Sequence, residues 1–109
     1  MELKELIQEM HRFVGAKGWY APGSRRPQTP RNISISLALE AAEVLEHFQW
    51  GDEPPRREDL SGELADVALY LMQLASILDI DLERAILDKL EKNYDRTWDE
   101  SADPGTGGA

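Results

Sequence analysis

Two short acidic motifs, EAAE at residues 40–43 and ELAD at residues 63–66, organise the rest of the chain. Each lies in a strongly apolar segment with helical spacing, and residues i and i+3 of a helix lie on one side of it, about one turn apart. Each motif therefore presents two carboxylates on one stripe. Two such helices side by side would gather four carboxylates, the oxygen-rich environment that a hard divalent cation requires.

The surroundings of these acids decide between a metal site and an ordinary solvated helix face. Apolar residues border the first acidic stripe on both sides, and a row of leucines runs beside the second. A helix that is apolar nearly all round is a buried helix, and a buried carboxylate is costly unless it is paired or binds metal. We therefore favour a metal site over a solvated face, with four candidate ligands: Glu40, Glu43, Glu63 and Asp66.

Composition narrows the classes of function. The chain has 109 residues, enough for one domain, and its 21 acidic against 12 basic residues give a net charge of −9. This charge argues against nucleic acid or an anionic membrane as a partner, although a bound metal would let the protein take a phosphate substrate. The lack of cysteine excludes disulfides and thiolate metal sites. Without a signal peptide pattern or a membrane-length apolar run, we expect a cytoplasmic protein.

The apolar spacing predicts four helices and no strand. They cover residues 2–16, Pro30 to about Gln49 or Trp50, a start between Arg57 and Ser61 to about Leu78, and roughly residues 82–97. Mostly short connections between them predict an all-α four-helix bundle, and the excess apolar surface predicts a homo-oligomer. We expect one domain over residues 1–98 and a disordered tail over residues 99–109.

One long connection stands out between the first two helices. Residues 18–30 contain three prolines and two glycines, which predicts a loop, and the loop and its flanks carry four basic residues, Lys17, Arg25, Arg26 and Arg31. A loop of this length in a small domain is often functional. It is either a solvated connector or a flap that faces a phosphate or a base, and the sequence leaves both open.

Other candidate residues each have a functional and a structural interpretation. Lys89 and Asn93 share a helical stripe and either bind phosphate oxygens or form structural contacts with the acids. Trp19 and Trp50 either stack on a base or pack against the protein. His47, one turn after Glu43, either binds metal or caps the acidic cluster.

Four segments, in this order, are similar to a known family: Arg31-Asn32, LEAAEVLEHFQW at 39–50, GELADVALY at 62–70 and KLEKN at 89–93. Together they resemble the MazG-like all-α nucleoside triphosphate pyrophosphohydrolases, most closely the dCTP-pyrophosphatase-like branch. The resemblance implies Mg²⁺-dependent cleavage between the α and β phosphates, giving monophosphate and pyrophosphate in the service of nucleotide-pool house-cleaning. It also implies a homodimer or dimer of dimers, with sites assembled partly from neighbouring subunits.

The resemblance also assigns roles to single residues. It implies that the four acids bind Mg²⁺ (or Mn²⁺ as a substitute) and act in catalysis, with Glu43 or Glu63 as the general base. The implied substrate-binding residues are Trp50, Tyr70, Lys89 and Asn93, and we add Trp19 and Arg31 from the long loop and its flank as further candidates for substrate binding. The chain departs from the family in the segment from Tyr20 to Pro30, which is longer and has no histidine before the Arg-Asn pair. That departure bears on base recognition more than on the chemistry.

Three alternatives remain beside this interpretation. Phosphoribosyl-ATP is the second substrate to consider. It is distinguished from a dNTP by the less aromatic site of its pyrophosphohydrolases, which should not need Trp50. A non-catalytic helical interaction module would account for the amphipathic helices, but not for acids beside apolar faces. A di-iron carboxylate bundle needs Glu-x-x-His pairs, and the residues three before the two histidines are Gln8 and Val44.

Overall fold

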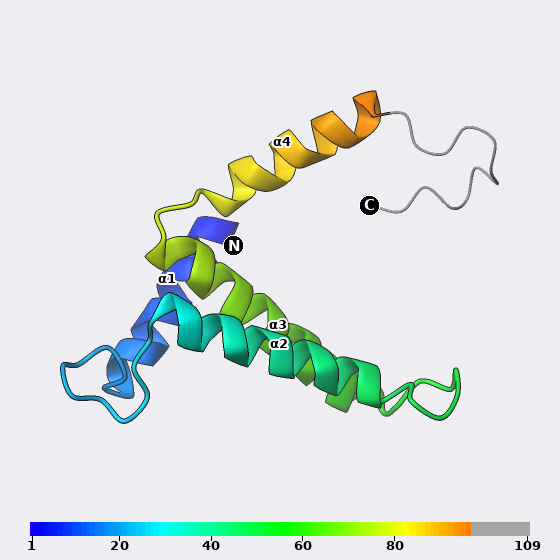
Figure 1. Ribbon diagram of the computed structural model, residues 1–109, viewed down its shortest axis with the longest axis horizontal. Helices are drawn as coiled ribbons and strands as arrows, with labels where there is room; N and C mark the ends of the chain where they lie inside the picture. The colour runs from blue at the N-terminus through cyan, green and yellow to red at the C-terminus, as the bar shows by residue number, and fades with distance from the viewer. Residues whose placement is uncertain (97–109) are drawn as a thin grey trace.

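The computed structural model describes residues 1–96 as four helices: α1 (Leu3–Ala16), α2 (Pro30–Glu46), α3 (Arg57–Ile77) and α4 (Leu82–Asp95) (Figure 1). No strand occurs in this range, which confirms the predicted all-α class. None of the helices within it combines the length and apolarity needed to cross a membrane. The tail predicted over residues 99–109 lies outside the described residues, so the domain boundary at residue 98 stays a prediction.

Local chemistry fixes where the helices begin. The Thr29 hydroxyl accepts a hydrogen bond from the backbone N–H of Asn32 at 3.2 Å, with Pro30 at the first helical position. The Asp81 carboxylate accepts one from the N–H of Arg84 at 3.0 Å. Both caps satisfy backbone donors that a helix start leaves free.

Left-handed residues end α1 and α3. Gly18 has a φ of 76°, and the next N–H, that of Trp19, bonds back to the carbonyl of Val14 at 3.2 Å. Asp79 has a φ of 57° in the equivalent position after α3, and the N–H of Ile80 bonds to the carbonyl of Ala75 at 2.8 Å. Both ends are Schellman motifs, and the first one directs Trp19 away from the axis of α1.

Helix α2 ends earlier than the apolar pattern predicts. It stops at Glu46, and residues 47–50 continue as turns held by i→i+3 bonds such as that from the N–H of Phe48 to the carbonyl of Leu45 at 2.9 Å. Such tightened turns are common at helix ends. Trp50 therefore lies beyond the helix on which its place was predicted.

Helix α3 is the centre of the molecule and contacts the other three helices. Helices α2 and α3 run side by side along most of their length, and α1 crosses α3 near its C-terminal half (Figure 1). The buried apolar side chains lie where α1, α2 and α3 meet: Met10, Val14, Ile33, Met72 and Ala75. This small core sits at the C-terminal half of α3 and supports the site described below.

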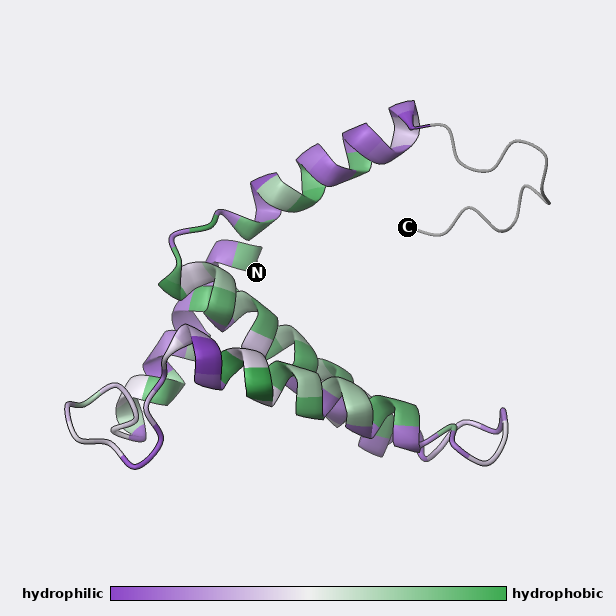
Figure 2. Ribbon diagram, viewed as in Figure 1, coloured by the Kyte–Doolittle hydropathy of each residue, from purple (hydrophilic) through white to green (hydrophobic). Residues whose placement is uncertain are grey.

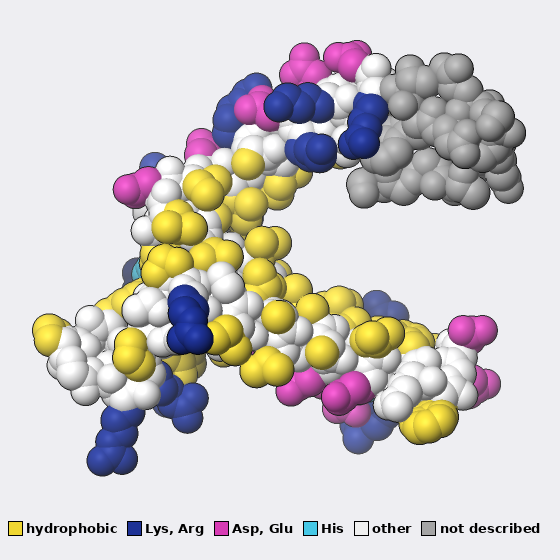
Figure 3. Space-filling model, in the orientation of Figure 1, with side chains coloured by type: hydrophobic (Ala, Val, Ile, Leu, Met, Phe, Trp, Pro, Cys, Tyr) yellow, Lys and Arg dark blue, Asp and Glu magenta, His cyan; other side chains and the backbone are white. Residues whose placement is uncertain are grey.

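Helix α4 projects away from the other three and meets only the end of α3 closely (Figure 1). Hydrophobic residues face the angle between α4 and the α2–α3 pair (Figure 2 and Figure 3). Many large apolar side chains are exposed there and elsewhere, among them Leu39, Leu64, Leu71, Leu78, Leu87 and Leu90. The leucine row of α3 is thus only partly covered, because one chain supplies partners for one face of that helix. A homo-oligomer that covers the rest stays a prediction.

Replacing Ile33 by alanine tests whether this small core holds the fold together. Ile33 is only 2% exposed, so the truncation removes buried contacts and leaves a cavity. We expect a loss of about 2–4 kcal/mol in the free energy of unfolding, measured by urea denaturation. The control is Ile80→Ala in the exposed α3–α4 junction, with an expected loss below about 1 kcal/mol. Equal losses in the two variants would contradict the assignment of the core.

Candidate functional site

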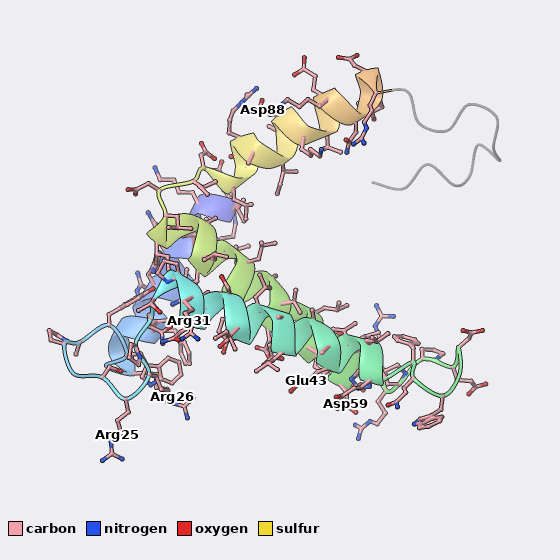
Figure 4. The ribbon with its side chains drawn as sticks, in the orientation of Figure 1. Arg25, Arg26, Arg31, Glu43, Asp59 and Asp88 are labelled. Carbon is pink, nitrogen blue, oxygen red and sulfur yellow. The ribbon has the colours of Figure 1, made fainter. Side chains whose placement is uncertain are left out.

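The four acids predicted as metal ligands lie near one another on the adjoining sides of α2 and α3. Glu40 is half-buried, and its Oε2 is buried without a hydrogen-bond partner among the described residues. Burial raises the pKa of Glu40, and so, in decreasing order, do its contact with Glu43 and the charges of Asp66 and Glu63. Figure 3 shows acidic side chains gathered along this edge, and Figure 4 labels Glu43 there. Each carboxylate therefore makes ionisation of Glu40 harder.

His47 closes one end of this cluster. Its Nε2 lies 2.5 Å from Oε2 of Glu63, and the two side chains are 21% and 26% exposed. Of the two roles that the sequence leaves open for His47, this contact matches that of a cap on the acids. It also fixes the orientation of the Glu63 carboxylate.

The four acids do not form a complete metal-coordination site in this structure. Among residues 1–96, no group of three or more His, Asp or Glu side chains is close enough together to hold a metal ion. The chemistry of the donors nevertheless fits a hard cation, because an unpaired buried carboxylate oxygen on Glu40 faces further carboxylates.

A groove of about 700 Å³ opens beside the acids, between α1, the 18–30 loop, the start of α2 and α3. Asp66 and Tyr70 line it, so the groove and the acidic cluster share a wall. Its other lining is mostly aromatic and aliphatic, with a few polar groups, which is typical of sites for small molecules. The apolar part includes Met10, Phe13, Val14, Trp19, Ile33 and Leu69, and the polar part includes Arg25, Arg26, Gln28, Asn32, Ser36 and Gln73.

Hydrogen bonds hold the 18–30 loop in place as one wall of the groove. Gln73 is 2% exposed, and its Nε2 donates to the Tyr20 hydroxyl at 3.2 Å and to Oε1 of Gln28 at 2.7 Å. His11 bridges the Tyr20 hydroxyl at 2.6 Å and Oγ of Ser76 at 2.7 Å. Burial raises the pKa of Tyr20, which keeps its hydroxyl protonated. The loop is therefore attached to both α1 and α3.

Aromatic contacts order the mouth of the groove. Trp19 packs edge-on against Phe13, with 5.7 Å between ring centroids, and the Arg26 guanidinium lies over the Trp19 ring at 5.4 Å. Figure 4 shows Arg25 and Arg26 on this loop and Arg31 at the start of α2. Arg31 is exposed and does not line the groove, whereas the neighbouring Asn32 does.

Three of the predicted substrate-binding residues lie apart from the groove. Trp50 is 90% exposed beyond the end of α2. Lys89 and Asn93 are on α4, which projects away from the groove. A single chain thus brings together Trp19, Tyr70 and the acids, but neither these three nor Arg31.

Sequence reasoning missed the polar residues that fasten the loop: His11, Tyr20, Gln28 and Gln73. Only Gln73 gave a usable signal, because it is a polar residue inside the most apolar part of α3. The other three carry no spacing pattern that points to one another. Their pairing depends on how the loop folds back.

Comparison with known proteins identifies the family of this chain. The model of the MazG-like family matches residues 35–103, a stretch that contains both acidic motifs. The chain belongs to the MazG-like family. The resemblance inferred from the four sequence segments is thereby confirmed.

Individual relatives agree with this MazG-like assignment. The chain is 32% identical to dCTP pyrophosphatase 1 from Rattus norvegicus and 33% identical to dCTP pyrophosphatase 1 from Homo sapiens, each over 102 residues and 84% of this chain. It spans 57% of the length of these relatives. A solved pyrophosphatase from Archaeoglobus fulgidus is 31% identical with a TM-score of 0.71, over 84% of this chain and 87% of that one.

The raised pKa of Glu40 predicts how stability depends on pH when no metal is present. The carboxyl of Glu40 is harder to ionise in the folded than in the unfolded state. The free energy of unfolding therefore falls as the pH rises from the usual pKa of a glutamate, about 4.3, through the raised pKa of Glu40. In EDTA at pH 7, Glu40→Gln should therefore melt at a higher temperature than the unsubstituted protein, and the gap should close toward pH 4.

The control for this melting experiment is Glu91→Gln, on the exposed face of α4. It should shift the midpoint little at either pH. A Glu40→Gln variant that melts at or below the temperature of the unsubstituted protein at pH 7 would show that Glu40 is not under charge repulsion.

Proposed function

We propose that this MazG-like protein is a metal-dependent nucleoside triphosphate pyrophosphohydrolase that cleaves a nucleotide such as dCTP to monophosphate and pyrophosphate. The observation that carries the proposal is the shared wall between the acidic cluster and the groove, formed by Asp66 and Tyr70. A base in the groove would leave its phosphates within reach of the acids. The names of the relatives, dCTP pyrophosphatase and pyrophosphatase, support the same reaction.

The acids carry the chemistry in this proposal. Glu40, Glu43, Glu63 and Asp66 are the residues that would hold Mg²⁺, with Mn²⁺ as a substitute. When bound, the cation would supply positive charge for the phosphates and would lower the pKa of a water nucleophile. Glu43 or Glu63 accepts the proton of the water that attacks the α phosphorus, and the bond to the bridging oxygen breaks as pyrophosphate leaves. His47 holds the Glu63 carboxylate in one orientation during this step.

The groove would hold the nucleoside. Trp19 offers a ring face to a base, and its packing against Phe13 restricts its movement. Tyr70 lines the groove next to Asp66 and would contact the sugar or the α phosphate. The arginines of the loop add positive charge at the rim of a site that is otherwise acidic.

Other predicted contacts fit a homodimer or a dimer of dimers. Trp50, Lys89, Asn93 and Arg31 do not reach the groove of their own chain, so we assign them to a site completed by another subunit. The exposed leucines along α3 and α4 supply an apolar surface for that assembly. We place this reaction in the cytoplasm as a house-cleaning activity on the nucleotide pool.

A panel of nucleotides tests the proposed function directly. Pyrophosphate release is measured with the four common dNTPs, dUTP and phosphoribosyl-ATP, with Mg²⁺ or with EDTA. We expect release from at least one dNTP, with monophosphate as the second product and loss of activity in EDTA. Release only from phosphoribosyl-ATP would assign the other substrate class. No release from any of them would favour a non-catalytic interaction module.

A further inference from the structure

The amide groups that line the groove are held in one direction by the backbone of the loop. Nε2 of Gln28 donates to the carbonyl of Arg26 at 2.6 Å, and Nδ2 of Asn32 donates to the carbonyl of Pro27 at 2.9 Å. A backbone carbonyl is an acceptor in every state, so neither amide can reverse without placing oxygen against oxygen. Both side chains therefore turn their nitrogens toward the loop.

This constraint is passed on to Gln73. Because Gln28 turns its nitrogen to the loop, its Oε1 faces α3 and accepts a hydrogen bond from Nε2 of Gln73 at 2.7 Å. The second hydrogen of that nitrogen goes to the Tyr20 hydroxyl at 3.2 Å. Reversing the Gln73 amide would put two carbonyl oxygens together. Both of its donors are thus engaged, and its orientation is fixed.

The oxygen of Gln73 remains available. Within residues 1–96, no hydrogen bond to Oε1 of Gln73 is present, although the side chain lines the groove and is only 2% exposed. A base that covers this acceptor without offering a matching donor binds unfavourably, because the acceptor would lose its partner in water and gain none. Such a site discriminates more strongly than an apolar pocket does.

We propose that Gln73 determines base specificity, selecting a base whose edge ends in an amino group, such as cytosine or adenine, over uracil or thymine. The inference rests on the proposed function and on the groove as the base site. Oδ1 of Asn32 is turned away from the loop in the same manner, so a second amide that lines the groove also keeps its acceptor free of the loop. Uracil and thymine carry a carbonyl oxygen where cytosine carries its amino group, so they would place an acceptor against the Gln73 oxygen in the position where cytosine places a donor.

The matched pair dCTP and dUTP tests this selection, because the two bases differ only in the amino or oxo group at position 4 and in N3, which is an acceptor in cytosine and an N–H donor in uracil. We expect kcat/KM for dCTP to exceed that for dUTP by about tenfold or more. In Gln73→Met, which keeps the length of the side chain and removes the acceptor, the ratio should fall to within about threefold. Most of that change should be a loss with dCTP.

A second variant keeps the test meaningful if Gln73→Met folds poorly. Gln28→Met changes a half-buried loop residue and removes the group that fixes the Gln73 amide, so the ratio should fall here too. The control is Gln8→Met on the exposed face of α1, which should keep the ratio of the unsubstituted protein. Circular dichroism and thermal melting report on folding in each case.

The outcomes separate this inference from the proposed function. If Gln73→Met cleaves dCTP and keeps the ratio of kcat/KM for dCTP to that for dUTP, the inference alone is overturned. An equal loss of kcat/KM with both nucleotides also overturns it, because that result indicates a purely structural role. If no triphosphate is cleaved, the proposed function fails, and calorimetric binding of dCMP against dUMP still tests the groove. If the unsubstituted protein binds dCMP more tightly than dUMP and Gln73→Met removes this preference, the inference is supported. If the unsubstituted protein binds dCMP and dUMP equally, the inference is contradicted.

Discussion

The packing of α2 along α3 is the constraint on which the rest of the structure depends. It sets one acidic motif beside the other, and the cost of that arrangement appears in Glu40, whose carboxyl is both desolvated and surrounded by like charge. A protein keeps such a group only where a cation or a proton relieves it. The contact of His47 with Glu63 relieves one acid at the edge of the cluster and leaves the unpaired oxygen of Glu40 at its centre.

The same helix pair also positions the groove. Residues of α3 on the side toward α1 form its floor, and the loop after α1 forms a wall that is attached through Gln73. A loop rich in proline and glycine thus acquires a fixed shape from a few polar contacts to two helices. The acidic cluster and the aromatic part of the groove lie on adjoining walls, which meet at Asp66 and Tyr70.

Sequence reasoning succeeded where local rules govern. The apolar spacing gives four helices, and the three-residue spacing of the acids places them on shared stripes. It was less accurate for the end of α2, where tightened turns replace the last predicted turn. It could not find the link from Gln28 to Gln73, because residues far apart in sequence pair only after the loop has folded. The placement of α4 also depends on long-range packing and not on periodicity.

The central claim is that acids from both helices serve one cation, and a Mn²⁺ titration followed by electron paramagnetic resonance tests it most directly. We expect saturable Mn²⁺ binding by the unsubstituted protein, and Mg²⁺ should compete for the same site. We expect binding to weaken by about 10-fold or more when either Glu40 on α2 or Asp66 on α3 is replaced by alanine. Binding that depends on only one helix, or that neither substitution changes, would contradict the central claim.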